Sequence, residues 1–333
     1  MSFKRTAIVG AGGWGTALAA LWARQGHDIT LWGNDPERTE RLRATRVNET
    51  YLPGVQLQDS VEITNDLDDC GGADLIVIVT PSVALRRIAE RLLATKINPH
   101  AVLLSCTKGI EHGSGKRMSE ILGELFPEHQ VAVMSGPNLA VEVAADLPTA
   151  TVLGCSEAAC AEELQEHLGS PHFRVYSSDE TIGIELGGAL KNVFAIPAGV
   201  SDGFGLGHNS KAALVTRSLA ELLRLGTAMG GNPRTFYGLS GAGDLIATCF
   251  SAHSRNRRVG EQLGRGQTRE QIASGTKSVA EGIPTAQSAY DCARKLGVET
   301  PIIDQVHAVL YEGKRPDRAM KELLGRDQKA ELV

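Results

Sequence analysis

Residues 7–19 read Ala7-Ile8-Val9-Gly10-Ala11-Gly12-Gly13-Trp14-Gly15-Thr16-Ala17-Leu18-Ala19. The apolar run over 7–9 predicts a buried strand, and the helix formers over 17–23 predict a helix after a tight turn. Gly10, Gly12 and Gly15 have the GxGxxG spacing in that turn. Glycine there permits the turn itself, a close approach of the backbone to a pyrophosphate, and packing of the helix on the strand. The stretch therefore predicts a dinucleotide site, with the phosphates at the N-terminus of the helix.

The composition is that of a globular protein with more than one core. The chain has 333 residues, of which 42% are hydrophobic and 22% charged, and its net charge is −5. This length predicts two domains. The absence of a basic stripe argues against nucleic acid as a partner, and no apolar run reaches the ~20 residues that span a bilayer. Six scattered cysteines favour reduced thiols in a cytoplasmic protein, and the cysteine and histidine spacings indicate no metal site.

Further strands are predicted downstream, separated by helices. Their ranges are 27–32, 74–80, 101–106, 131–134, 151–154 and 173–176. Alternating strands and helices require a mostly parallel sheet, so residues 1–180 are expected to form a Rossmann-like α/β domain. Tyr51–Gly54 is interpreted as a turn. Ligands of such sheets bind beyond the carboxyl ends of the strands, where this chain places Asn34, Lys108 and the segment from Gly136 to Asn138.

Strand signals stop near Ser178, and helical patterns continue to the end of the chain. Residues 181–333 are therefore expected to form an all-α domain that binds the substrate. Its first helix, over 180–200, is rich in glycine and alanine and carries little charge, which predicts a central and tightly packed position.

Lys191 lies inside that apolar helix, in the segment Glu185-Leu186-Gly187-Gly188-Ala189-Leu190-Lys191. A buried ammonium is costly unless it lies in a cleft or has a partner, and desolvation lowers its pKa toward neutrality. Such a lysine is suited to donate or accept a proton. A lysine that reaches solvent at the helix edge is the structural alternative. Lys108, at a strand end, is a second candidate cation, and its alternative is a loop lysine in solvent.

A third group of candidates follows a glycine-rich loop over 238–245. Asp244 could orient hydroxyls or pair with a lysine, and Ser254 is expected to cap a helix over 255–263. Arg255 and Asn256 in the first turn of that helix predict a phosphate site. The first turn also holds further arginines, which is unfavourable there unless an anion binds. A solvated basic helix start is the alternative interpretation.

The second strand ends beside Asn34 and Asp35. An acid at this position accepts hydrogen bonds from the adenosine ribose, whereas a cation accommodates a 2′-phosphate. Asp35 could equally cap the next helix, and Arg38 follows one turn later. The choice between NAD and NADP therefore stays open at this point.

Taken together, these residues resemble the bacterial NAD(P)-dependent glycerol-3-phosphate dehydrogenase family over nearly the whole chain. The matching motifs are GAGGWGTALA (10–19), YLPG (51–54), TKG (107–109), SGPNLAVEVA (135–144), ELGGALKNV (185–193), GLSGAGDL (238–245), SRNRR (254–258) and VAEG (279–282). The resemblance implies reversible NAD(P)H-dependent reduction of dihydroxyacetone phosphate to sn-glycerol 3-phosphate, which supplies glycerophospholipid biosynthesis.

The resemblance also implies the roles of individual residues. Lys191 would be the proton donor and acceptor. The substrate would be lined by Lys108, Gly136, Asn138, Lys191, Asp244, Ser254, Arg255 and Asn256. The cofactor would contact Gly10, Gly12, Gly13, Trp14, Gly15, Asn34, Lys108, Ala140, Arg255, Val279 and Glu281.

Three positions depart from the family pattern, in which position 13 is usually Ser, position 34 is often His or Arg, and position 138 is usually Ser or Thr. Asn34 leaves the preference for NADP in doubt, and none of the three removes a catalytic group. A cytoplasmic homodimer is the expected form. The alternatives are another hydroxyacid dehydrogenase of the same superfamily with a carboxylate substrate, and a cofactor-sensing protein without turnover.

Overall fold

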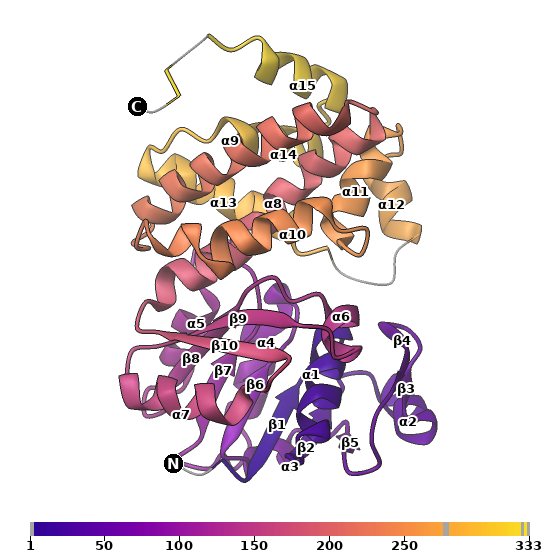
Figure 1. Ribbon diagram of the computed structural model, residues 1–333, viewed down its shortest axis with the longest axis vertical. Coiled ribbons are helices and arrows are strands. Elements are labelled where there is room, and N and C mark those ends of the chain that lie inside the picture. Colours follow the sequence, from indigo (N-terminus) through magenta and orange to yellow (C-terminus); the bar gives the residue numbers. More distant parts are fainter. Residues whose placement is uncertain (1–2, 276–279, 328–329, 332–333) are drawn as a thin grey trace.

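The computed structural model describes residues 3–275, 280–327 and 330–331. Its first half is built on an eight-stranded sheet of order β10-β9-β8-β7-β6-β1-β2-β5 (Figure 1). The strands are β1 (Arg5–Val9), β2 (Asp28–Trp32), β5 (Glu62–Thr64), β6 (Leu75–Ile78), β7 (Val102–Ser105), β8 (Val131–Ser135), β9 (Thr149–Cys155) and β10 (Phe173–Ser178). Only the pair β8–β9 is antiparallel within this sheet. The prediction of a mostly parallel Rossmann-like sheet is therefore confirmed.

Helices cover both faces of this sheet because its central strands are apolar on both sides. All four residues of β6 are buried, as expected of a parallel strand between two helical layers. One apolar core contains Trp22 and Leu31, and another contains Trp32 and Ile76. The helices are α1 (Gly13–Arg24), α2 (Pro36–Thr45), α3 (Asp68–Gly71), α4 (Ser82–Leu93), α5 (Met118–Leu125), α6 (Ala140–Ala144) and α7 (Ala158–Leu168).

A two-stranded hairpin replaces the turn predicted over Tyr51–Gly54. Strand β3 (Val47–Asn48) pairs antiparallel with β4 (Leu52–Gln56), so the turn itself lies at residues 49–51. Leu52 is fully buried against α1 and α6, which holds this segment in β4. Pro53 is compatible with this strand because a two-stranded hairpin leaves one edge of each strand unpaired. The turn prediction is therefore wrong for 52–54.

The second half of the described chain is helical and is built around α8 (Thr181–Gly203). The other α-helices are α9 (Gly207–Ala228), α10 (Asp244–Phe250), α11 (Arg255–Gly264), α12 (Arg269–Gly275), α13 (Gly282–Leu296), α14 (Pro301–Tyr311) and α15 (Pro316–Leu324). Helix α8 is buried along almost its entire length, and α9, α10, α11, α13 and α14 pack on it. Its central position is as predicted. No helix within the described ranges combines the length and apolarity needed to cross a bilayer.

Two carboxylates join the helical half to the sheet half. Glu185 of α8 accepts hydrogen bonds from the backbone N–H of Ser119 at 2.8 Å and from Arg117 Nη1 at 2.7 Å, both at the start of α5. Glu281, just before α13, accepts from the backbone N–H of Ser82 at 3.1 Å, at the start of α4. Burial raises the pKa of both carboxyls, and these hydrogen bonds oppose that shift. Each carboxylate therefore lies at a helix N-terminus, which favours negative charge.

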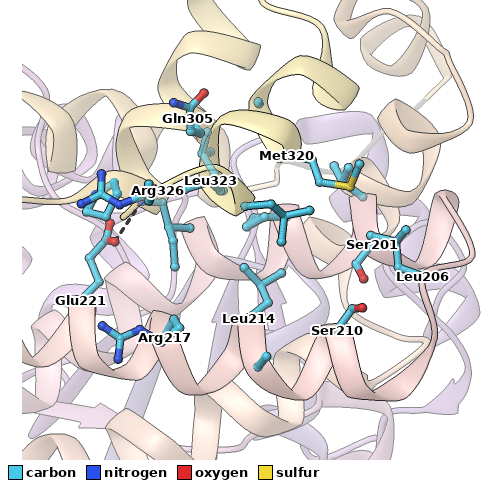
Figure 2. Close-up of a pocket in the computed structure, with 18 of the residues that line it drawn as sticks. Ser201, Leu206, Ser210, Leu214, Arg217, Glu221, Gln305, Met320, Leu323 and Arg326 are labelled. Atoms are coloured by element: carbon cyan, nitrogen blue, oxygen red, sulfur yellow. Dashed lines mark hydrogen bonds between the residues drawn. The ribbon is translucent and has the colours of Figure 1, made fainter. Parts of the chain in front are cut away.

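A cavity of about 960 Å³ lies at the far end of the helical half, between α8, α9, α14 and α15. Figure 2 shows Leu214, Met320 and Leu323 on its apolar walls and Ser201 and Ser210 at one end. The cavity shares no residue with the glycine turn or with the candidate catalytic residues.

Candidate active site

The turn between β1 and α1 has the shape that the glycine spacing predicts. Gly10 has φ +132°, and a Cβ there would lie 2.6 Å from the carbonyl oxygen of Val79. A Cβ on Gly15 would lie 2.0 Å from the carbonyl oxygen of Gly10, so a side chain would separate helix from strand. Open space lies beside Gly12, and no side chain caps the first turn of α1. The uncapped N–H groups beside open space fit the pyrophosphate of a dinucleotide.

Gly13 lies in close contact with the turn of the hairpin. A Cβ on Gly13 would lie 2.8 Å from the carbonyl oxygen of Tyr51, so the turn at 49–51 packs directly on the helix start. Trp14 and Ala140 both pack on the small apolar cluster around Leu52. These predicted cofactor contacts therefore lie around one end of α1. Val279 lies outside the described residues.

The loop after β2 resolves one of the open alternatives. Asp35 Oδ1 accepts from the backbone N–H of Arg38 at 3.0 Å, and Asp35 Oδ2 accepts from Arg38 Nε at 2.7 Å. The hydrogen bonds from Arg38 lower the pKa of this carboxyl. Asp35 is thus the N-cap of α2, which was the alternative to a role as an acceptor for the ribose. Asn34 Oδ1 accepts from Arg91 Nη1 at 2.9 Å, a partner that sequence reasoning missed.

One buried carboxylate joins the two candidate lysines. Asp244 Oδ1 lies 2.9 Å from Lys191 Nζ, and Asp244 Oδ2 lies 2.6 Å from Lys108 Nζ. Lys108 also donates to the carbonyl oxygen of Gly136 at 3.0 Å. Lys191 is only 7% exposed and Asp244 only 2%, which argues against a lysine that reaches solvent at a helix edge. The structure therefore brings four of the predicted residues together where the helical half meets the ends of β7 and β8.

Two glycines on α8 allow the helix to approach these residues closely. A Cβ on Gly188 would lie 2.3 Å from Ser135 Oγ at the end of β8 and 3.5 Å from Lys108 Cδ. A Cβ on Gly187 would lie 2.7 Å from the carbonyl oxygen of Ser240, just before α10. Larger side chains at either position would push α8 away from both segments. The Gly-Gly pair one turn before Lys191 thus lets α8 approach its charged partners.

Burial and mutual attraction determine the charges of this group. The pKa of the Lys191 ammonium is lowered to about 8: burial is the largest cause, Asp244 opposes the shift, and Lys108 adds to it. Burial would raise the pKa of Asp244, but the two lysines hold it below its ordinary value. Near pH 7 the arrangement is a carboxylate between two ammonium groups, one of which can lose its proton within about one pH unit.

Thr248 is a fifth member of this group that sequence reasoning did not assign to the site. Its Oγ1 accepts from Lys191 Nζ at 2.5 Å and donates to Asp244 Oδ1 at 3.2 Å. Asp244 and Thr248 are four residues apart on α10, so they lie on the same helix face. This four-residue spacing is the sequence signal from which Thr248 could have been assigned to the site.

The start of α11 holds the residues of the predicted phosphate site. Ser254 caps the helix, and its Oγ accepts from the backbone N–H of Arg257 at 3.2 Å. Arg257 Nε lies 2.6 Å from Asp202 Oδ2, so its charge is balanced within the helical half. Arg257 therefore needs no bound anion, because an acid distant in the sequence pairs with it. Arg255 and Arg258 remain exposed at the helix start, and Glu281 attracts Arg255 electrostatically.

The two asparagines expected at the substrate already have protein partners. Asn256 is buried, donates to Asn192 Oδ1 at 2.8 Å and accepts from the backbone N–H of Gly282 at 2.9 Å. Asn138 Nδ2 donates to Thr151 Oγ1 at 2.9 Å, while its Oδ1 is buried without a partner among the described residues. Contact of either residue with a substrate stays a prediction.

Comparisons with known proteins place this geometry in a family. Residues 5–161 match the model described as "NAD-dependent glycerol-3-phosphate dehydrogenase N-terminus", and residues 180–321 match its C-terminus counterpart. A glycerol-3-phosphate dehydrogenase [NAD(P)+] of Geobacter sp. (strain M21) is 46% identical over 334 residues, covering 99% of each chain. The corresponding protein of Trichlorobacter lovleyi is 48% identical over 329 residues, covering 97% of this chain and 98% of the relative.

A solved structure agrees with the sequence relatives. The glycerol-3-phosphate dehydrogenase of Coxiella burnetii superposes with a TM-score of 0.94 at 38% identity, covering 97% of this chain and 99% of that one. The α/β sheet, the helical half and both halves of the family model thus agree along the chain. The protein belongs to the NAD-dependent glycerol-3-phosphate dehydrogenase family.

Proposed function

We propose that the protein catalyses the reversible NAD(P)H-dependent reduction of dihydroxyacetone phosphate to sn-glycerol 3-phosphate, which supplies glycerophospholipid biosynthesis. The observation that carries this proposal is the buried contact of Lys191 and Lys108 with Asp244 beside the carboxyl ends of the parallel strands. The Lys191 ammonium, whose pKa is lowered to about 8 chiefly by burial, lies there together with a second cation and a shared counter-ion. This set suits the reduction of a ketone, in which the carbonyl oxygen gains a proton.

The glycine turn is the proposed cofactor site. A nicotinamide dinucleotide bound there supplies the hydride of the reaction. The chain's own contribution is the uncapped N-terminus of α1 and the open space beside Gly12, which bind and orient a pyrophosphate. The remaining proposed contacts are Gly10, Gly13, Trp14, Gly15, Asn34, Lys108, Ala140, Arg255, Val279 and Glu281.

Lys191 is proposed to protonate the C2 oxygen during reduction and to accept that proton during oxidation. Asp244 holds the ammonium in place and, by its charge, raises the pKa that burial lowers, so that the acid form is populated near neutrality. Thr248 fixes the direction of the Nζ group through its hydrogen bond. Lys108, which Asp244 and the Gly136 carbonyl hold, is proposed to orient the substrate oxygen with a positive charge.

The start of α11 is the proposed phosphate site. Arg255 supplies a guanidinium there, and the first-turn N–H groups supply the favourable end of the helix dipole. The other proposed substrate contacts are Gly136, Asn138, Ser254 and Asn256. The proposed substrate site therefore combines residues of the sheet half with residues of the helical half.

A single absorbance assay tests the proposed reaction. The purified chain is mixed with NADH or NADPH and with dihydroxyacetone phosphate, or with 2-oxo acids as carboxylate controls. Oxidation of the reduced cofactor is expected with the phosphorylated ketone and not with the 2-oxo acids. Turnover of a 2-oxo acid alone would favour the other hydroxyacid dehydrogenases, and cofactor binding without any turnover would favour a sensing protein.

Arg255→Gln is expected to raise KM for dihydroxyacetone phosphate by about 10- to 100-fold, because a hydrogen bond to a charged group contributes about 1.5–3 kcal/mol. The kcat should change much less, since the bond is present in both ground and transition states. Steady-state kinetics measure both constants. Arg265→Gln, at the other end of α11, is the matched control and should leave KM unchanged. An unaltered KM in Arg255→Gln would contradict the proposed phosphate site.

We also propose a division into a cofactor domain, residues 1–180, and a substrate domain, residues 181–333, and a homodimer in the cytoplasm. The last strand ends at Ser178 and α8 begins at Thr181, which supports the division. All six cysteines are free thiols, which is typical of a reducing compartment. Light scattering after gel filtration tests the homodimer, and a mass of one chain would contradict it.

A further inference from the structure

Arg91, near the end of α4, lies beside the loop that follows β2. Its Nη1 donates to Asn34 Oδ1 at 2.9 Å, and its guanidinium carbon lies 5.4 Å from the centre of the Trp32 ring. A neutral amide oxygen and an aromatic face thus hold the guanidinium on the surface of the molecule. In this fold, the end of the second strand is where the adenosine ribose of a dinucleotide lies.

Arg38 has an acidic partner, whereas the polar partner of Arg91 is neutral. Asp35 Oδ2 lies 2.7 Å from Arg38 Nη2 and neutralises that guanidinium. Within the described part of the chain, no carboxylate lies within ion-pair distance of Arg91, whose polar partner is the neutral Asn34. Arg91 therefore contributes a full positive charge to this corner of the sheet, with most of its five N–H donors unused.

The side-chain acceptors at the same corner already have donors within the protein. Both carboxylate oxygens of Asp35 already accept from Arg38, and the carbonyl oxygen of Asn34 already accepts from Arg91. What the side chains of Asn34 and Arg91 still offer is donors: an amide N–H₂ and guanidinium N–H groups. Recognition of a ribose 2′-hydroxyl by an acid needs a free acceptor, whereas a 2′-phosphate needs donors and positive charge.

We propose that Arg91 binds the 2′-phosphate of NADP and that the chain consequently prefers NADPH to NADH. The inference rests on the proposed placement of the cofactor on the turn from Gly10 to Gly15. Trp32 and Asn34 hold the planar guanidinium before binding, so little side-chain freedom is lost when the phosphate arrives. The charge of Asp35 opposes a phosphate weakly, because Arg38 offsets it.

Calorimetric titration of the full chain with NADPH, NADH and adenosine 2′,5′-bisphosphate tests the proposal without any turnover. Arg91→Gln is expected to raise the Kd for NADPH and for the bisphosphate by about 10- to 100-fold, the effect of one charge-assisted contact, and to leave the Kd for NADH unchanged. Arg87→Gln removes the same charge from an exposed position one turn earlier on α4 and should change none of the three.

Asn34→Asp is a second and opposite test. A carboxylate at position 34 would neutralise Arg91 and supply an acceptor, so NADPH binding should weaken while NADH binding tightens. The proposal is overturned if Arg91→Gln binds NADPH like the wild type, if it weakens NADPH and NADH equally, or if Arg87→Gln produces the same loss. It also fails, together with the cofactor site, if the wild type binds neither nucleotide. Selective NADPH binding without turnover of dihydroxyacetone phosphate would refute only the proposed substrate.

Discussion

Lys191→Met is expected to lower kcat for the reduction of dihydroxyacetone phosphate by about 10²- to 10⁴-fold, the usual contribution of a positioned general acid. The side chain is buried, and its Nζ contacts Asp244 and Thr248. Methionine has a similar length and keeps the apolar part of the packing, so the loss should come from the missing proton donor. Rapid-quench or absorbance kinetics at pH 7 measure the loss, and calorimetry should give unchanged Kd values for the cofactor.

Lys211→Met is the matched control for this variant. Lys211 is also a buried lysine with an acidic partner, Asp202, whose Oδ2 lies 2.8 Å from its Nζ. Asp202 keeps Arg257 as a second partner, so removal of Lys211 does not leave a buried charge unpaired. Turnover within a few-fold of the wild type is expected for Lys211→Met. Comparable turnover in Lys191→Met and the wild type would refute the proposed role.

Asp244→Asn should cause the other large effect, on stability as well as turnover. Without the carboxylate, the buried Lys191 would lose its acidic partner and keep the nearby charge of Lys108, and breaking a buried pair in this way costs about 3–5 kcal/mol. The pKa of Lys191 should fall further, because Asp244 is the neighbour that raises it. Lys191 would then be neutral at pH 7.5 and unable to donate a proton, so turnover should be mostly lost there and partly regained at pH 6.

The control for Asp244→Asn is Asp202→Asn, which also removes a carboxylate between two cations, Lys211 and Arg257. Thermal unfolding and kcat/KM are measured for both variants between pH 6 and pH 9. Both should be less stable than the wild type. A regain of activity at pH 6 is expected only for Asp244→Asn. The same regain in both variants, or in neither, would mean that Asp244 does not control the proton of Lys191.

The sheet and the central helix could be predicted because they depend on local patterns. The β-branched run ending at Ile78 requires burial on both faces, and the glycines of the first turn require a close strand-to-helix contact wherever they occur. Polar residues that follow parallel strands meet at one edge for topological reasons. Lys191 stood out because a charge inside an apolar helix needs an explanation in any fold.

The pairings within the site were less accessible, because they join residues far apart in the chain. The sequence around Arg257 does not identify Asp202 as its partner, and the sequence around Asn34 does not identify Arg91. The strand over 52–54 was missed because Tyr51–Gly54 has the residues of a turn, while burial of Leu52 against α1 and α6 decides its conformation. Tertiary packing overrode local preference in that case.

The pH dependence of both reaction directions tests the central claim most directly. The claim is that Lys191 gives its proton to the C2 oxygen in reduction and takes it back in oxidation. For the wild type, kcat/KM for reduction should fall as pH rises through about 8, and kcat/KM for oxidation should rise through the same region, because burial lowers the pKa of Lys191 to about 8. The residual activity of Lys191→Met should show neither the fall nor the rise, which are the two limbs of the pH profile. Limbs that persist in Lys191→Met, or a wild type without them, would contradict the claim.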